Sequence, residues 1–129
     1  MCLQGASALN NLLGEQHDPS IRAFVIWEPV LPTDLGAPST ATLRRLSDLR
    51  VSQYWDKDHL VSRLMGESDR ASVVWDYVAV YRPGELWDAA PPKPAYSNVP
   101  VVHSINGVKN ALRPLVDRKH AEGMGTVQH

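Results

Sequence analysis

The chain has 129 residues, of which 43% are hydrophobic and 21% charged, and its formal net charge at pH 7 is −1. These values are typical of one soluble globular domain and give no reason to expect nucleic acid or an anionic membrane as a partner. No stretch approaches the roughly 18 apolar residues of a membrane span, and the N-terminus lacks the pattern of a signal peptide. The one cysteine excludes an intramolecular disulfide, so we expect a cytoplasmic protein.

The first part of the chain predicts a helix followed by a strand. Apolar residues recur at helical spacing from Cys2 to Leu13, and Gly14 is a natural stop. The five apolar residues Ala23–Trp27 are too few for a helix and are rich in β-branched and aromatic side chains. They predict a strand buried on both faces. Pro29 and Pro32 lack backbone donors, so sheet pairing should stop near Glu28.

The middle of the chain predicts two short helices around an ambiguous segment. Ser39 is a candidate N-cap for a helix over residues 40–46, and Asp56 for a helix over residues 57–65 that Gly66 closes. Between them, residues 49–55 alternate apolar and polar side chains. This alternation fits a short edge strand, and a turn of helix fits nearly as well.

The last part of the chain predicts a hairpin and a closing helix. Residues 71–81 form the second strong strand signal, and Arg82–Glu85 has the Pro and Gly of a type II turn. Leu86 and Trp87 would begin the return strand. Residues 101–115 repeat apolar positions at helical spacing, and Pro114 should kink or end that helix. Residues 118–129 are expected to form a flexible tail.

Together these elements predict an α/β fold in one domain over residues 1–117. The strands Phe24–Trp27 and Val73–Tyr81 should be interior strands of one mixed sheet. The helices over residues 2–13 and 101–115 should pack on that sheet, because each has one apolar face to bury.

The order of elements resembles that of a thioredoxin-like domain. The segment Cys2-Leu3-Gln4-Gly5-Ala6 corresponds to the second cysteine of a Cys-x-x-Cys pair and the helix turn after it. Residues 75–87 correspond to the hairpin and residues 101–115 to the closing helix. The run Trp27-Glu28-Pro29-Val30-Leu31-Pro32-Thr33-Asp34 is similar to a stretch in uncharacterised bacterial thioredoxin-like proteins. The resemblance implies an incomplete thioredoxin-like fold with a mixed sheet flanked by helices.

Two departures from the family change what the resemblance implies. The first cysteine and the central strand are missing, and no proline directly precedes the strand Val73–Tyr81. The dithiol–disulfide cycle therefore does not carry over. The sheet must close either by direct pairing of Phe24–Trp27 with the hairpin or through a second chain. We expect the second solution, a homodimer with the first helix and the neighbouring sheet edge at its interface.

Candidate site residues lie in two of the segments that carry this resemblance, the one that begins with Cys2 and the one over residues 27–34. Cys2 starts a helix, where amides and the helix dipole favour a reactive thiolate; the alternative is a small side chain at a frayed end. Glu28 and Asp34 bracket the exit of the strand as an acid–base pair, as ligand anchors, or merely as turn caps. The predicted ligand-binding set combines them with aromatic side chains that would otherwise be core: Trp27, Glu28, Pro29, Asp34 and Trp55.

No cofactor or metal is expected from the sequence. Asp56, Asp58 and His59 are close together but have no recognised metal-ligand spacing, and no glycine-rich phosphate loop is present. Two hypotheses follow. The chain is a degenerate thioredoxin-like module without dithiol oxidoreductase activity that binds a protein or small ligand, or it is a single-cysteine redox protein acting through Cys2.

Overall fold

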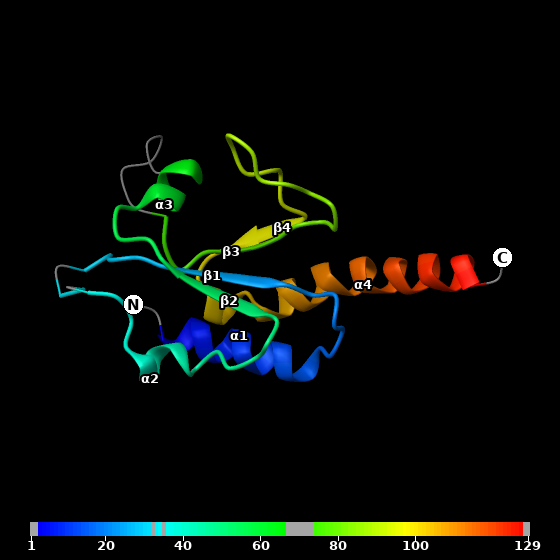
Figure 1. Cartoon of the computed structure of the whole chain (residues 1–129), viewed down its shortest axis with the longest axis horizontal. Coiled ribbons are helices and arrows are strands. Elements are labelled where there is room, and N and C mark those ends of the chain that lie inside the picture. The colour runs from blue at the N-terminus through cyan, green and yellow to red at the C-terminus, as the bar shows by residue number, and fades with distance from the viewer. Residues whose placement is uncertain (1–2, 32, 35, 67–73, 128–129) are drawn as a thin grey trace.

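The computed structural model describes residues 3–31, 33–34, 36–66 and 74–127 as a mixed α/β fold (Figure 1). The α/β class predicted from the sequence is confirmed. In chain order the elements are α1 (Leu3–Glu15), β1 (Ala23–Trp27), α2 (Thr40–Leu43), β2 (Val51–Trp55), α3 (Leu60–Leu64), β3 (Val78–Val80), β4 (Tyr96–Asn98), the 3-10 turn η2 (Val101–His103) and α4 (Ile105–Val127).

The strands among the described residues form two separate sheets of two strands each. β1 pairs in parallel with β2, from Ala23 opposite Val51 to Trp27 opposite Trp55. β3 pairs antiparallel with β4. The prediction of one sheet with both strong strands in its interior is therefore wrong, and so is direct pairing of β1 with the hairpin. The ambiguous segment over residues 49–55 is the strand that β1 pairs with, and it matches β1 in length.

The hairpin differs from the prediction in its second strand. The turn is present, because the Glu85 amide donates to the Arg82 carbonyl at 3.3 Å and Gly84 has φ +82°. Leu86 and Trp87 nevertheless form no strand, and β3 pairs with β4, beyond three prolines. Prolines cannot donate to a sheet, so pairing resumes only after them. Residues 71–73 of the predicted strand lie outside the described residues.

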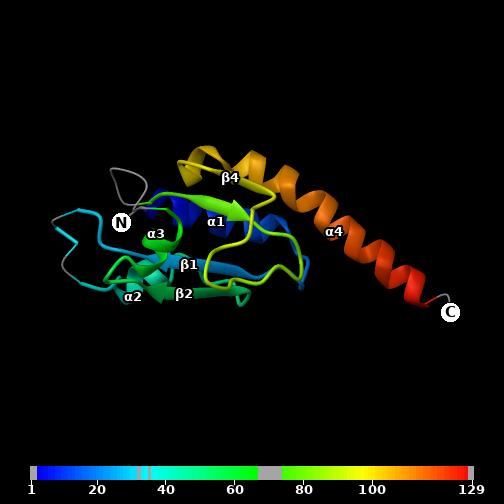
Figure 2. The ribbon, with the colours of Figure 1, turned by 90° about the horizontal axis from the view of Figure 1, so that it is seen from above.

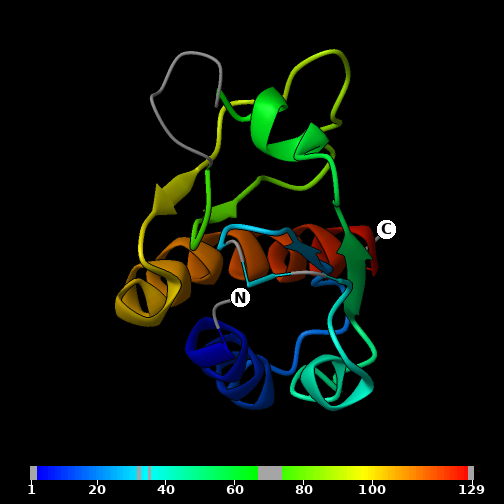
Figure 3. The same ribbon diagram turned by 90° about the vertical axis from the view of Figure 1, so that its left-hand side faces the viewer.

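The core lies between α1 and the two sheets. One buried cluster joins α1 to β3 and α4, and contains Leu12, Leu13, Val80 and Val108. The other joins α1 and the α2 region to the β1–β2 pair, and contains Ala6, Trp27 and Leu46. α1 and α2 lie on one side of the β1–β2 pair and α3 on the other (Figure 3). They leave Phe24 66% exposed, so the prediction that β1 is buried on both faces is wrong.

The last helix, α4, continues through Pro114 to Val127. The end expected at Pro114 is not seen, because the missing hydrogen bond is offset by the packing of Leu112 and Leu115 against the core. The C-terminal half of α4 projects away from the other elements (Figure 2). The backbone of residues 118–127, expected to be a flexible tail, is helical in the structure.

Gly107 in α4 should resist replacement by alanine. A β-carbon at this position would overlap with the ring and hydroxyl of Tyr96, the first residue of β4. Alanine favours helix by about 1 kcal/mol, but Tyr96 must move, so we expect Gly107→Ala to destabilise the protein by about 1–3 kcal/mol in denaturant unfolding. Gly14→Ala is the matched control: Gly14 lies in α1, and its β-carbon would meet nothing within 4 Å. An equal gain of stability in both variants would contradict the close approach of Tyr96.

Candidate functional site

The candidate site lies at the carboxyl ends of the parallel strands β1 and β2. Because Trp27 is opposite Trp55, the loops that follow them leave the same edge of the sheet. We call residues 28–31, 33–34 and 56–59 the carboxyl-end loops. Open α/β sheets bind ligands at this edge, where the strands end and the connections diverge.

The carboxyl-end loops are tied to each other through the main chain. The Asp56 amide donates to the Trp27 carbonyl at 2.7 Å, and Nε2 of His59 donates to the Pro29 carbonyl at 2.5 Å. The backbone of His59 has φ +58°, in the left-handed region that few residues other than glycine adopt. Its imidazole thus holds the first loop from the start of α3.

The carboxylates of Asp34 and Asp56 organise these loops. Asp34 Oδ2 accepts the amides of Val30 and Leu31 at 3.0 and 2.9 Å, and these hydrogen bonds lower the pKa of its carboxyl group. Buried Asp56 accepts the amides of Leu60 and Val61 at 2.9 and 2.7 Å. Asp56 therefore caps the first amides of α3, but the predicted start of the helix at residue 57 is wrong, because α3 begins at Leu60 and His59 is its N-cap residue. Ionised Asp34 is a weak base, which disfavours acid–base chemistry at this position.

Trp27 and Trp55 are brought together, but in the core. Trp27 is 5% exposed, packs against Ala6 and Leu46, and donates its indole N–H to Oε1 of Gln53 at 2.9 Å. Trp55 packs, half-buried, against the same cluster. Glu28 and Pro29 lie beside them at the start of the first carboxyl-end loop, both half-buried. Cys2 lies outside the described residues.

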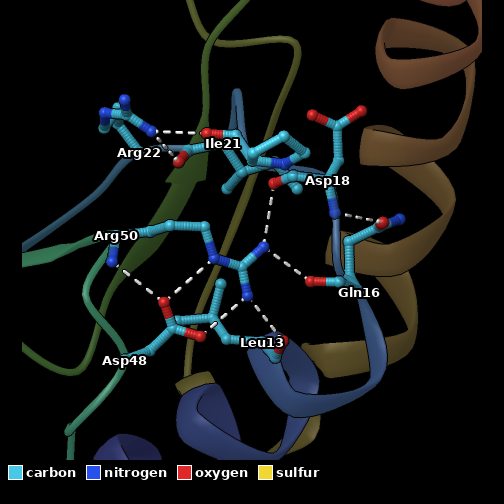
Figure 4. A network of polar contacts seen from close by, with 8 residues as sticks. Leu13, Gln16, Asp18, Ile21, Arg22, Asp48 and Arg50 are labelled. Carbon is cyan, nitrogen blue, oxygen red and sulfur yellow. Dashed lines mark hydrogen bonds and ion pairs between the residues drawn. The ribbon is translucent and has the colours of Figure 1, made fainter.

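A polar cluster that the sequence analysis did not identify lies at the opposite, amino end of the β1–β2 pair (Figure 4). The Arg50 guanidinium donates to the carbonyls of Leu13 and Gln16, both at 2.6 Å, and of Asp18 at 3.0 Å. It also binds both carboxylate oxygens of Asp48, at 2.9 and 2.8 Å. The nearest sequence signal is the pair Asp48 and Arg50, and nothing in the pattern links it to a helix end more than 30 residues earlier.

The Arg50 cluster is a structural clamp. All five N–H groups of the guanidinium are used, so none is left for a substrate. The hydrogen bonds from Arg50 lower the pKa of Asp48 to about 2, and Asp48 in turn raises the pKa of Arg50. The cluster fastens the carbonyl end of α1 to the start of β2, where a cation is favoured by the helix dipole.

Apolar side chains are unusually exposed over the described surface. Those on the β1–β2 pair and α3 are Phe24, Tyr54, Leu60 and Leu64. Exposed apolar side chains that lie close together are the kind of surface that a partner covers.

Several kinds of site find no support in the part of the chain that the structure describes. It contains no group of three or more His, Cys, Asp or Glu side chains placed to hold a metal ion. None of its helices combines the length and apolar character needed to cross a bilayer. Comparison with known proteins gives no matching family model, no similar curated protein and no similar solved structure.

Proposed function

We propose that this chain is a non-catalytic binding module of incomplete thioredoxin-like type, which forms a homodimer and recognises a partner protein through one face of the β1–β2 pair. The observation that supports this proposal most directly is the exposure of Phe24, 66%, and Tyr54, 53%. Side chains alternate along a strand, and Ile26 lies opposite Tyr54. Phe24, Ile26 and Tyr54 therefore share the face that points away from α1 and α2.

The candidate site supports binding over catalysis. The carboxylates of Asp34 and Asp56 accept main-chain amides that shape the loops, and Trp27 serves the core. Aromatic side chains with an exposed face are, by contrast, the residues that contribute most to protein interfaces.

The alternative is a thiol protein that acts through Cys2. It rests on the sequence-based expectation that Cys2 lies in the first turn of a helix, where a thiolate is stabilised. The two functions differ in their dependence on the thiol. A binding module keeps its partner when Cys2 is replaced with serine, and a thiol protein loses it.

Photo-crosslinking tests the proposed binding face. A photoreactive phenylalanine analogue at position 54 should capture a defined partner protein in cells, and capture should persist in a Cys2→Ser background. The control carries the same analogue at position 49, since Leu49 is fully exposed but lies in the turn before β2. Equal capture from both positions, or none from position 54, would reject this face as the binding surface.

A further inference from the structure

One edge of β2 has no strand beside it among the residues that the structure describes. The Ala23 amide donates to the Arg50 carbonyl at 3.0 Å, and the Asp56 amide donates to the Trp27 carbonyl at 2.7 Å. These two bonds fix which residues of β2 bond to β1. The main-chain N–H and C=O groups of Ser52 and Tyr54 therefore point towards β1. The main-chain groups of Gln53 and Trp55 point away from it. Among the described residues they have no hydrogen-bond partner, and β2 lies at an outer flank of the molecule (Figures 2 and 3).

This edge lacks the usual protection against pairing. Edge strands are normally blunted by charged side chains, proline, bulges or a covering loop. β2 reads Val-Ser-Gln-Tyr-Trp, with no charge and no proline, and it matches β1 residue for residue without a bulge.

We infer that β2 pairs antiparallel with β2 of a second copy of the chain, about a two-fold axis that passes beside Gln53. This inference rests on the homodimer of the proposed function and assigns its interface. The axis places Gln53 opposite its own image, and Val51 opposite Trp55. Gln53 then exchanges two main-chain hydrogen bonds with its image, and the Trp55 amide meets the Val51 carbonyl of the other copy. The Val51 amide takes no part, because it already donates to the Asp48 carbonyl at 3.1 Å. Ser52 then lies opposite Tyr54 on the exposed face.

A second copy is the occupant that this edge fits best. β2 carries no charge, so it can lie antiparallel to its own image across a two-fold axis without repulsion between like charges. The net charge of −1 per chain also opposes association only weakly. The resulting sheet has the order β1–β2–β2–β1 and doubles the exposed face that carries Phe24 and Tyr54.

A pair of double variants tests this register. In the first, Ser52→Lys is combined with Tyr54→Lys, so that each lysine faces a lysine of the other copy. In the second, Ser52→Lys is combined with Tyr54→Glu, so that opposite charges face each other across the axis. Both positions are exposed in the described chain. In light scattering at micromolar concentration, the wild type and the Lys/Glu variant should have twice the mass of one 14.3 kDa chain. The Lys/Lys variant should be monomeric, or associate at least tenfold more weakly.

Amide exchange in the unmutated protein gives a readout that does not depend on variants. In the dimer, the Gln53 and Trp55 amides should be protected together with those of Ser52 and Tyr54, and dilution should remove protection only from the first two. Two results would overturn the inference. Fast exchange of Gln53 and Trp55 in a dimeric sample, or equal association of both double variants, would place the homodimer on another surface. A monomeric wild type would reject the homodimer as well, without bearing on partner capture at position 54.

Discussion

Replacing Arg50 with alanine should lower the free energy of unfolding by about 3 kcal/mol. Three carbonyls, from Leu13, Gln16 and Asp18, lose their charged donor, and Asp48 loses its counter-ion. An unsatisfied part-buried carbonyl costs more than an ordinary hydrogen bond contributes, because water does not fully replace the donor. Loss of the guanidinium also frees the end of α1 from β2. This matters because α1 contributes residues to both core clusters. Urea unfolding at neutral pH measures the effect.

Arg50→Lys is the matched control for this clamp. Lysine keeps the positive charge but has one ammonium group, which cannot span three carbonyls and a carboxylate. We expect its loss of stability to lie between those of the wild type and the alanine variant. If the lysine variant were as stable as the wild type, the clamp would act through charge and not through the geometry of the guanidinium. A loss below about 1 kcal/mol in Arg50→Ala, the size of an exposed ion pair, would mean that water satisfies the carbonyls.

The same clamp predicts a dependence on acid. The pKa of Asp48 is lowered from 3.8 to about 2 in the folded chain, chiefly by hydrogen bonds from Arg50. A lowered pKa stabilises the fold fully above the unfolded value, and that contribution disappears as the pH falls from 3.8 towards 2. The wild type should therefore lose stability over this range, and the Arg50→Ala variant should lose less.

Local features of this fold could be predicted from the sequence because they depend on neighbouring residues. The apolar spacing of α1, the run of β1, the Ser39 cap of α2 and the Asp56 cap of α3 all involve contacts within a few positions. The turn at Gly84 belongs to the same group, since its φ of +82° suits glycine.

The pairing of strands could not be predicted in this way. Ala23–Trp27 reads as a fully buried strand because it contains no polar residue, yet its neighbour on one side is β2 and on the other no described strand. Which strand pairs with which depends on contacts more than 20 residues apart, and the composition of β1 does not contain that information. The candidate site shows the same limit. Trp27 can be buried in the core because Gln53, on the neighbouring strand, accepts the hydrogen bond of its indole N–H.

The second large loss of stability is expected from replacing Leu12 of α1, and not from replacing a residue of the apolar strand β1. Leu12 is 2% exposed and joins α1 to Val80 of β3 and Val108 of α4. Leu12→Ala should cost about 2–5 kcal/mol, because three elements border the cavity it leaves and none can move into it freely. Phe24→Ala is the control with a larger side chain, and its cost should stay below about 1 kcal/mol, since most of that ring already contacts water. Denaturant unfolding of the purified chain compares the two. A greater loss from Phe24→Ala would show that the outer face of β1 is covered in solution, and that the core extends through it.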